Sequence, residues 1–131
     1  MHKEFSRLLD AARETLARSY AVYSRIRVGA ALLTEKGQVF SGANVENASY
    51  GLSLCAERAA VAGAVAAEGP GMRIRAIAVV SDQSGPFSPC GACRQMIFEF
   101  GPQALVIFPG AEGLIEAPIV ELLPHAFRLQ S

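Results

Sequence analysis

The sequence has little that would direct the chain to a membrane, to nucleic acid or out of the cell. Its 12 basic residues are balanced by 12 acidic ones, so the formal net charge is zero and no bulk attraction to nucleic acid is expected. No apolar run approaches the ~20 residues of a transmembrane helix. The opening MHKEFSRLLDAARE is charged and amphipathic, unlike a signal peptide. We therefore expect a soluble cytoplasmic protein.

Internal repeats, low-complexity runs and long linkers are also missing from the 131 residues. This length suits one domain over residues 1–131, which can build a hydrophobic core without covalent staples. Charged residues make up only 18%, below the typical ~25%. Such a charge-poor surface favours homo-oligomerisation, although an ordinary alanine-rich protein would give a similar composition.

Hydrophobic periodicity predicts an alternation of helices and strands. Helices are expected over residues 3–18 and 54–68, from Ser88 as N-cap with Pro89 in the first turn to Phe100, and from Pro118 to Leu123. A β-hairpin over 28–34 and 38–43, buried strands at 74–81 and 104–109, and a short edge strand at 113–117 are expected between them, with a loop over 44–53. The pattern predicts an α/β fold with a mixed sheet and helices on both faces.

The chain has only three cysteines, and they fall at two predicted helix starts. Cys55 opens one helix, and Cys90 and Cys93 open another. Inert burial and a redox pair are the ordinary alternatives for such thiols. Helix N-termini stabilise thiolates, however, and a spacing of three places Cys90 and Cys93 on one helical face. Zinc is the ion that best suits three converging thiolates.

The metal site so predicted lacks an obvious fourth protein ligand. His2 and His125 are the only histidines, and if neither binds, the fourth position is open to water, as in catalytic zinc sites. Glu57, two residues after Cys55, could then exchange protons with that water, although a lone helical glutamate is more often simply solvated.

Three thiolates leave a net charge of −1 on a Zn²⁺ site, which opposes ionisation of a bound water. A guanidinium that donates to a ligand sulfur would withdraw part of this charge. Arg58 and Arg94 both follow predicted ligands. Arg58 is favoured because it directly follows the Cys-x-Glu unit, whereas Arg94 could equally serve packing.

At this point the residues match a known signature. CAE at 55–57 and PCGAC at 89–93 resemble the zinc-deaminase pattern with a cysteine as first ligand. YSRIRVGAALL, GANVENASYGLSLCAER, SPCGACRQ and ELLPHAF resemble, in order and spacing, the small homotetrameric cytidine deaminases of the cytidine/deoxycytidylate deaminase superfamily. The resemblance covers about residues 5–127.

The resemblance implies a three-layer α/β/α sandwich around a five-stranded mixed sheet. It also implies one Zn²⁺ per subunit and the hydrolytic deamination of cytidine and 2′-deoxycytidine to uridine and 2′-deoxyuridine plus ammonia, in pyrimidine salvage. The partners implied are a small nucleoside and three further copies of the chain, which share composite active sites.

Individual residues receive roles from the same resemblance. Cys55, Cys90 and Cys93 would hold zinc, and Glu57 would move protons. The substrate contacts implied are Ile26, Asn44, Val45, Glu46, Ala48, Tyr50, Ala56 and Phe127.

Some of these substrate contacts have a clear chemical purpose. The amide of Asn44 and the carboxylate of Glu46 can together donate to and accept from the ribose diol. The Ala56 N–H would hold the 2-oxo group. Ala48 and Tyr50 would approach the 5′ end of a nucleoside in a neighbouring subunit, and Phe127 would stack on a pyrimidine in an adjacent subunit's site.

Two segments depart from the family's usual pattern. Where the family typically has YSxFPVGAAL, with an aromatic residue lining the base pocket, this chain has Ile26 and Arg27. The usual GCN is Gly42-Ala43-Asn44 here. An aliphatic side chain keeps apolar character but loses stacking geometry, so the change at residue 26 bears on base preference.

The sequence therefore leaves three candidate functions open. The first is a free-nucleoside deaminase, for which the NVEN ribose clamp is present. The second is a deaminase of nucleic acid, which the neutral charge disfavours, or of a modified or non-standard aminopyrimidine, which Ile26 allows. The third is a non-catalytic zinc module, which requires a fourth protein ligand.

Overall fold

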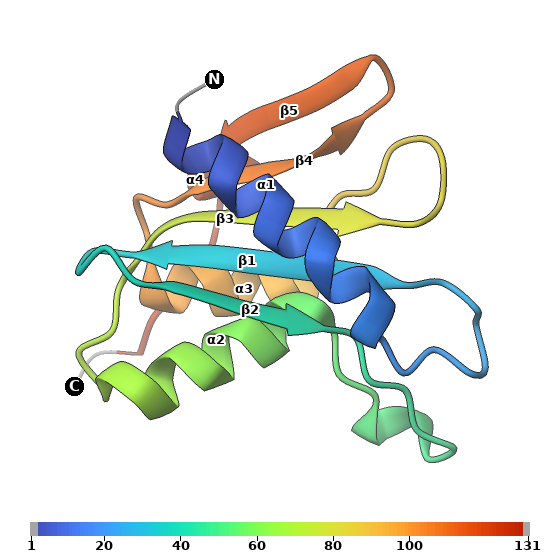
Figure 1. The fold of residues 1–131 in the computed structure, drawn as a ribbon. Coiled ribbons are helices and arrows are strands. Elements are labelled where there is room, and N and C mark those ends of the chain that lie inside the picture. The colour runs from blue at the N-terminus through green and yellow to red at the C-terminus, as the bar shows by residue number, and fades with distance from the viewer. Residues whose placement is uncertain (1–2, 130–131) are drawn as a thin grey trace.

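The structure, a computed structural model, describes residues 3–129 and contains a five-stranded sheet with helices on both faces (Figure 1). Along the chain the elements are α1 (Lys3–Thr15), η1 (Leu16–Arg18), β1 (Val28–Thr34), β2 (Val39–Ala43), η2 (Tyr50–Leu52), α2 (Ala56–Glu68), β3 (Ile74–Ser81), α3 (Gly91–Phe100), β4 (Leu105–Gly110), β5 (Gly113–Pro118) and α4 (Ile119–Leu122). The predicted order of helices and strands is confirmed.

The sheet has the strand order β2-β1-β3-β4-β5. The pairs β1–β2, β1–β3 and β4–β5 are antiparallel, and β3–β4 is parallel. The sheet is therefore mixed, as predicted, with β5 at one edge. The chain crosses over twice: α2 lies in the connection from β2 to β3, which passes β1, and α3 lies in the connection between the parallel neighbours β3 and β4.

Two hydrophobic layers enclose the sheet. On one face α1 buries Leu8 and Ala12 against Ala31 of β1. On the other face α2 and α3 bury Val61 and Ile97 in a cluster that includes residues of β1, β3 and β4. Figure 1 shows α1 on one side of the sheet and α2 and α3 on the other. The predicted three-layer α/β/α sandwich is thus confirmed.

The start of α3 differs from the prediction. We expected Ser88 as N-cap and Pro89 in the first turn, but Cys90 is the N-cap and the helix begins at Gly91. The Cys93 N–H donates to the Cys90 sulfur at 3.5 Å, so a thiol does what the serine hydroxyl was expected to do. Ser88 Oγ instead accepts from Arg94 Nη2.

Within residues 3–129, no helix is long and apolar enough to cross a bilayer. The longest helices, α1 and α2, have 13 residues each, well short of the ~20 that a span requires. This agrees with the lack of long apolar runs in the sequence.

Candidate metal centre and substrate cavity

Two helix starts bring the three cysteines together. Cys55 is the N-cap of α2, and Cys90 is the N-cap of α3, with Cys93 in the first turn of that helix. Because α2 and α3 pack side by side on one face of the sheet, both helix N-termini point their partial positive charge at the same place. The Cys90 and Cys93 sulfurs are 3.4 Å apart, and those of Cys55 and Cys90 are 4.0 Å apart.

This sulfur triangle fits zinc. All three sulfur atoms lie within 4.8 Å of one another. A tetrahedral zinc with Zn–S bonds of about 2.3 Å requires sulfur–sulfur distances of roughly 3.8 Å. Among residues 3–129 the metal-binding group contains the three cysteines and no histidine; His125 is therefore outside it, and His2 lies outside the described residues. Three protein ligands match the catalytic rather than the closed structural kind of zinc site.

The Arg58 guanidinium lies against the sulfur cluster. Its Nη2 donates to the Cys55 sulfur at 3.4 Å, and its Nε is buried without a hydrogen-bond partner. A thiol hydrogen bond from Cys93, together with Arg58, lowers the pKa of Cys55 to about 5. A thiolate forms readily in such surroundings, which is the state that binds metal.

Arg94 has a different role in the fold. Its guanidinium donates to the carbonyl oxygens of Pro89 (2.8 Å) and Leu122 (2.9 Å) and to Ser88 Oγ (3.2 Å). These bonds fix the segment before Cys90 to the end of α4, consistent with the packing alternative considered for this residue.

Glu57 is a buried carboxyl group in the first turn of α2. Its side chain is only 3% exposed, whereas glutamate side chains are almost never fully buried unless they are paired. Burial raises its pKa above the usual range, because desolvation disfavours the charged form. A carboxyl group with a raised pKa beside a metal site is suited to accept and return a proton.

A cavity of about 400 Å³ opens onto Cys55, Cys90 and Glu57. Its lining has three parts that differ in chemistry. The part at the metal centre consists of Cys55, Glu57, Arg58 and Cys90. The polar part consists of Asn44, Glu46, Tyr50, Ser53 and Ser88, and the apolar part of Val28, Leu54, Ala56 and Phe87. A ligand with an apolar ring and a hydroxylated part would match this division.

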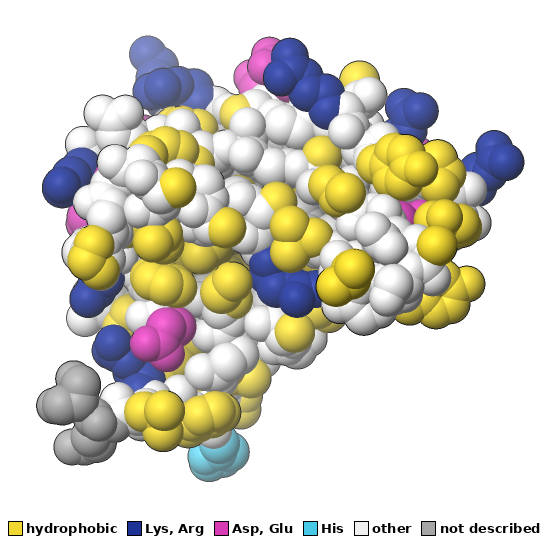
Figure 2. Space-filling view, turned by 90° about the horizontal axis from the view of Figure 1, so that it is seen from below, with side chains coloured by type: hydrophobic (Ala, Val, Ile, Leu, Met, Phe, Trp, Pro, Cys, Tyr) yellow, Lys and Arg dark blue, Asp and Glu magenta, His cyan; other side chains and the backbone are white. Residues whose placement is uncertain are grey.

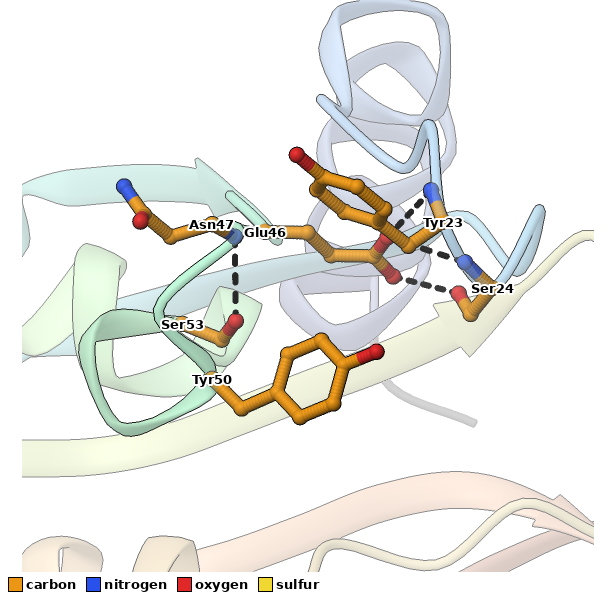
Figure 3. A pocket seen from close by; sticks show the side chains of 6 residues that line it. All are labelled: Tyr23, Ser24, Glu46, Asn47, Tyr50 and Ser53. Atoms are coloured by element: carbon orange, nitrogen blue, oxygen red, sulfur yellow. Dashed lines mark hydrogen bonds between the residues drawn. The ribbon is translucent and has the colours of Figure 1, made fainter.

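A second cavity, of about 430 Å³, adjoins the first because Glu46, Tyr50 and Ser53 line both. Figure 3 shows the Glu46 carboxylate pointing toward Tyr23 and Ser24. Its Oε1 accepts from the N–H groups of both residues, at 2.9 and 3.0 Å, and its Oε2 accepts from the Ser24 hydroxyl. The Ser24 hydroxyl, above all, lowers the pKa of Glu46. The carboxylate is thus fixed in place and ionised.

Asn44 and Glu46 stand on a segment held from both sides. Tyr20 exchanges backbone hydrogen bonds with residues 44 and 46, and Val45 pairs with Leu54. The side chain of Asn44 is 9% exposed; its Oδ1 accepts from the Val28 N–H and its Nδ2 donates to the Ile26 carbonyl, both at 2.9 Å.

The structure does not bring every predicted substrate contact to these cavities. Asn44, Glu46, Tyr50 and Ala56 line one or both, whereas Ile26, Val45, Ala48 and Phe127 line neither. Tyr50 and Phe127 are strongly exposed, at 78% and 66%. The contacts expected from Ala48, Tyr50 and Phe127 across subunits concern other copies of the chain and stay predictions.

Sequence reasoning missed several lining residues, chiefly Val28, Ser53, Leu54 and Phe87. Ser53 and Leu54 directly precede Cys55, so their nearness to the metal centre was readable from the sequence. Phe87 gave a weaker signal, its place shortly before Cys90. Nothing in the sequence indicated that its side chain packs beside Val28.

Comparison with known proteins gives consistent matches. Residues 2–108 match the family model for the cytidine and deoxycytidylate deaminase zinc-binding region. The chain is 47% identical over 123 residues to a cytidine deaminase of Halalkalibacterium halodurans, covering 92% of this chain and 91% of that protein. It is 41% identical over 127 residues to one of Sporosarcina psychrophila, covering 95% and 91%.

Solved structures agree with the sequence matches. The crystal structure of a cytidine deaminase from Burkholderia pseudomallei superposes with a TM-score of 0.86 at 46% identity, covering 97% of this chain and 100% of that one. That of the Mycobacterium tuberculosis cytidine deaminase superposes with a TM-score of 0.85 at 38% identity, covering 98% and 100%.

Proposed function

The chain belongs to the cytidine and deoxycytidylate deaminase family, and we propose that its cavity binds cytidine and 2′-deoxycytidine and hydrolyses the 4-amino group. The products are uridine or 2′-deoxyuridine and ammonia, and the role is pyrimidine salvage. The observation that carries the proposal is a carboxyl group only 3% exposed, Glu57, in a cavity that also contains cysteines of a zinc-compatible triad.

Cys55, Cys90 and Cys93 are the proposed zinc ligands, one ion per subunit. When bound, zinc supplies a Lewis acid that makes a water molecule nucleophilic at neutral pH. Arg58 offsets part of the negative charge of the three sulfurs, because its Nη2 already donates to Cys55.

Glu57 is the proposed proton carrier. It takes a proton from the attacking water and delivers it to N3 of the pyrimidine, while the water oxygen adds to C4. It then carries the second proton to the 4-amino group, the C4–N bond breaks and ammonia leaves. The raised pKa of Glu57 suits a group that must both accept and give up a proton near neutral pH.

Asn44 and Glu46 are the proposed ribose contacts. The Asn44 amide uses one lone pair of Oδ1 and one N–H of Nδ2 in hydrogen bonds to the backbone. A second lone pair and a second N–H are left for the ribose hydroxyl groups. Glu46 is held by residues 23 and 24, and a carboxylate retains a further acceptor site after three bonds. The Ala56 N–H, at the start of α2, is the proposed donor to the 2-oxo group.

We further propose that one domain of residues 1–131 forms each subunit of a cytoplasmic homotetramer. Figure 2 views the molecule from the side on which α2 lies and shows hydrophobic side chains spread over the middle of this face. Two of the large apolar side chains that are well exposed in the protomer are Leu52, at 69%, and Phe127, at 66%. Contacts between copies would cover such surface.

The decisive experiment follows the ultraviolet spectrum of cytidine and of deoxycytidine after addition of zinc-loaded protein. We expect conversion to the uracil product, and we expect Glu57→Gln to keep its zinc while turnover falls by roughly 10²–10⁴-fold, the range of general acid–base catalysis. Glu68→Gln is the matched control, because Glu68 ends the same helix and bonds Thr34.

Two results would contradict the proposal. Normal turnover by Glu57→Gln would remove Glu57 as the proton carrier. Inactivity of the zinc-loaded parent on both nucleosides would discard the standard substrates, and modified aminopyrimidines would be assayed next.

A further inference from the structure

We propose that the Phe87 ring is the aromatic wall that each protomer itself provides for the pyrimidine base, on which the base rests. The inference rests on the proposed function and deepens it by naming the side chain that selects a flat ring. The segment between β3 and α3 would then supply the aromatic contact, rather than the segment before β1 that contains Ile26.

The chemistry of the site fixes where the base lies. C4 of the pyrimidine must approach the cysteines and Glu57, because that is where the amino group is replaced. The ribose hydroxyls require polar partners, which Asn44 and Glu46 provide in the same cavity. The base is therefore held between these two groups, against the apolar part of the lining.

Phe87 is the aromatic residue of that apolar part. It is the only phenylalanine among the described residues that line the cavity, where Val28, Leu54 and Ala56 are its apolar companions. The ring is partly buried and packs against the buried cluster formed by Val28, Ala30, Ala56 and Val79. A side chain that both packs on the core and lines the cavity can offer its remaining surface to a ligand, and stacked aromatic pairs gain more than the area they bury.

The backbone around Phe87 is fixed on both sides. The Phe87 N–H donates to the Pro109 carbonyl of β4 at 2.9 Å, and Arg94 holds the next two residues through Ser88 Oγ and the Pro89 carbonyl. A wall fixed before the ligand arrives binds with less loss of entropy than a mobile one.

Ile26 is poorly placed for the same task within the protomer. It lines neither cavity, and its backbone is committed to other partners: the carbonyl accepts from Asn44 and the N–H donates to Ser24 Oγ. Its side chain is 37% exposed. On this account the segment between β3 and α3 supplies the aromatic ring that residue 26 lacks.

The test compares binding of uridine with that of 5,6-dihydrouridine by calorimetry on zinc-loaded protein. The second ligand keeps the ribose and both carbonyl groups but has a puckered ring that stacks poorly. In Phe87→Leu we expect weaker uridine binding by about 2- to 10-fold, a similar rise in KM for cytidine, unchanged zinc content, and a smaller preference for uridine over dihydrouridine. Phe87→Tyr, which keeps the ring, should retain the preference.

Phe98→Leu is the matched control, because Phe98 is also partly buried but packs in the core between α3 and the sheet. It should leave the preference unchanged. Phe87→Met, which keeps most of the volume without the ring, provides the same comparison if the leucine variant folds poorly. An unchanged preference for the flat ring in both Phe87→Leu and Phe87→Met would overturn the inference. Failure of the parent protein to deaminate cytidine would instead count against the proposed function.

Discussion

Glu46 shows how a neighbouring hydroxyl group sets the position and charge of a proposed substrate contact. Its carboxylate bonds the Ser24 hydroxyl and the N–H groups of Tyr23 and Ser24, and these bonds lower its pKa. Because the folded-state pKa lies below the ordinary carboxyl value, these bonds are intact above that value and are lost as the pH falls through the lowered one.

We predict that Ser24→Ala moves the pKa of Glu46 back up toward its ordinary value. The bonds of Glu46 would then be lost at a higher pH than in the parent, which the carboxyl ¹³C shift of labelled Glu46 would follow directly. At neutral pH Glu46 stays ionised but is held less firmly, so KM for cytidine should rise about two- to fivefold with little change in kcat.

Ser53→Ala is the control for this prediction. Ser53 lines the same two cavities, but its hydroxyl accepts from the Asn47 N–H rather than bonding Glu46. An equal shift of the Glu46 pKa in both variants, or none in Ser24→Ala, would show that the Ser24 hydroxyl does not control this carboxylate.

The sequence alone led to the metal centre because its chemistry is local. Cys90 and Cys93 are three residues apart, which places them on one helical face, and the deaminase signature joined this pair to Cys55 and Glu57. Phe87 was missed because its importance depends on contact with Val28 and Ala56, which lie far away in the sequence. Ile26 was predicted to contact the substrate because of its position in the family pattern, whereas in the structure it lines neither cavity and its backbone bonds Ser24 and Asn44.

The contact between β2 and α2 sets where the metal-binding helix begins. A Cβ atom at Gly42 would lie 2.6 Å from the Ala60 nitrogen and 2.7 Å from the Ala56 oxygen, so only glycine lets the strand approach the helix this closely. Cys55 and Glu57 stand at the start of that helix and move with it.

We therefore predict that Gly42→Ala lowers the free energy of unfolding by about 1–3 kcal/mol, the usual cost of overpacking, and lowers kcat as well. Urea denaturation and cytidine turnover of the zinc-loaded protein would measure both. Gly63→Ala is the control: a Cβ there meets nothing within 4 Å in the protomer, and alanine favours the helix interior by about 1 kcal/mol. A Gly42→Ala protein as stable as the parent would refute this account of the contact.

Element boundaries were predictable except where a functional side chain replaces the usual one. Strand bounds and helix ends followed from apolar runs and from Gly and Pro. The start of α3 was misplaced because Ser88 and Pro89 form a good capping pair by propensity, yet the thiol of Cys90 caps the helix. Capping propensities do not reveal that Cys90, a predicted metal ligand, is also the N-cap of the helix.

Across the whole molecule, the three cysteines join the starts of two helices that lie far apart in the sequence. Cys55 belongs to the start of α2 and Cys90 and Cys93 to the start of α3, and Cys90 follows Cys55 by 35 positions. Zinc held by all three would cross-link the layer of helices on that face of the sheet. Without zinc, three converging sulfur atoms and the charged Arg58 would remain at the end of the cavity.

We therefore predict that removing zinc with a chelator lowers the melting temperature by about 10 °C or more. A ligand at 1,000 times its Kd stabilises the folded state by about 4 kcal/mol, and each kcal/mol moves the transition of a chain of this size by several degrees. Returning zinc should restore the melting temperature of the parent. Cys90→Ala should neither bind the metal fully nor respond to it, while Glu57→Gln should respond like the parent, because its ligand set is intact. A Cys90→Ala protein that regains full zinc content and the same thermal shift would remove Cys90 from the ligand set.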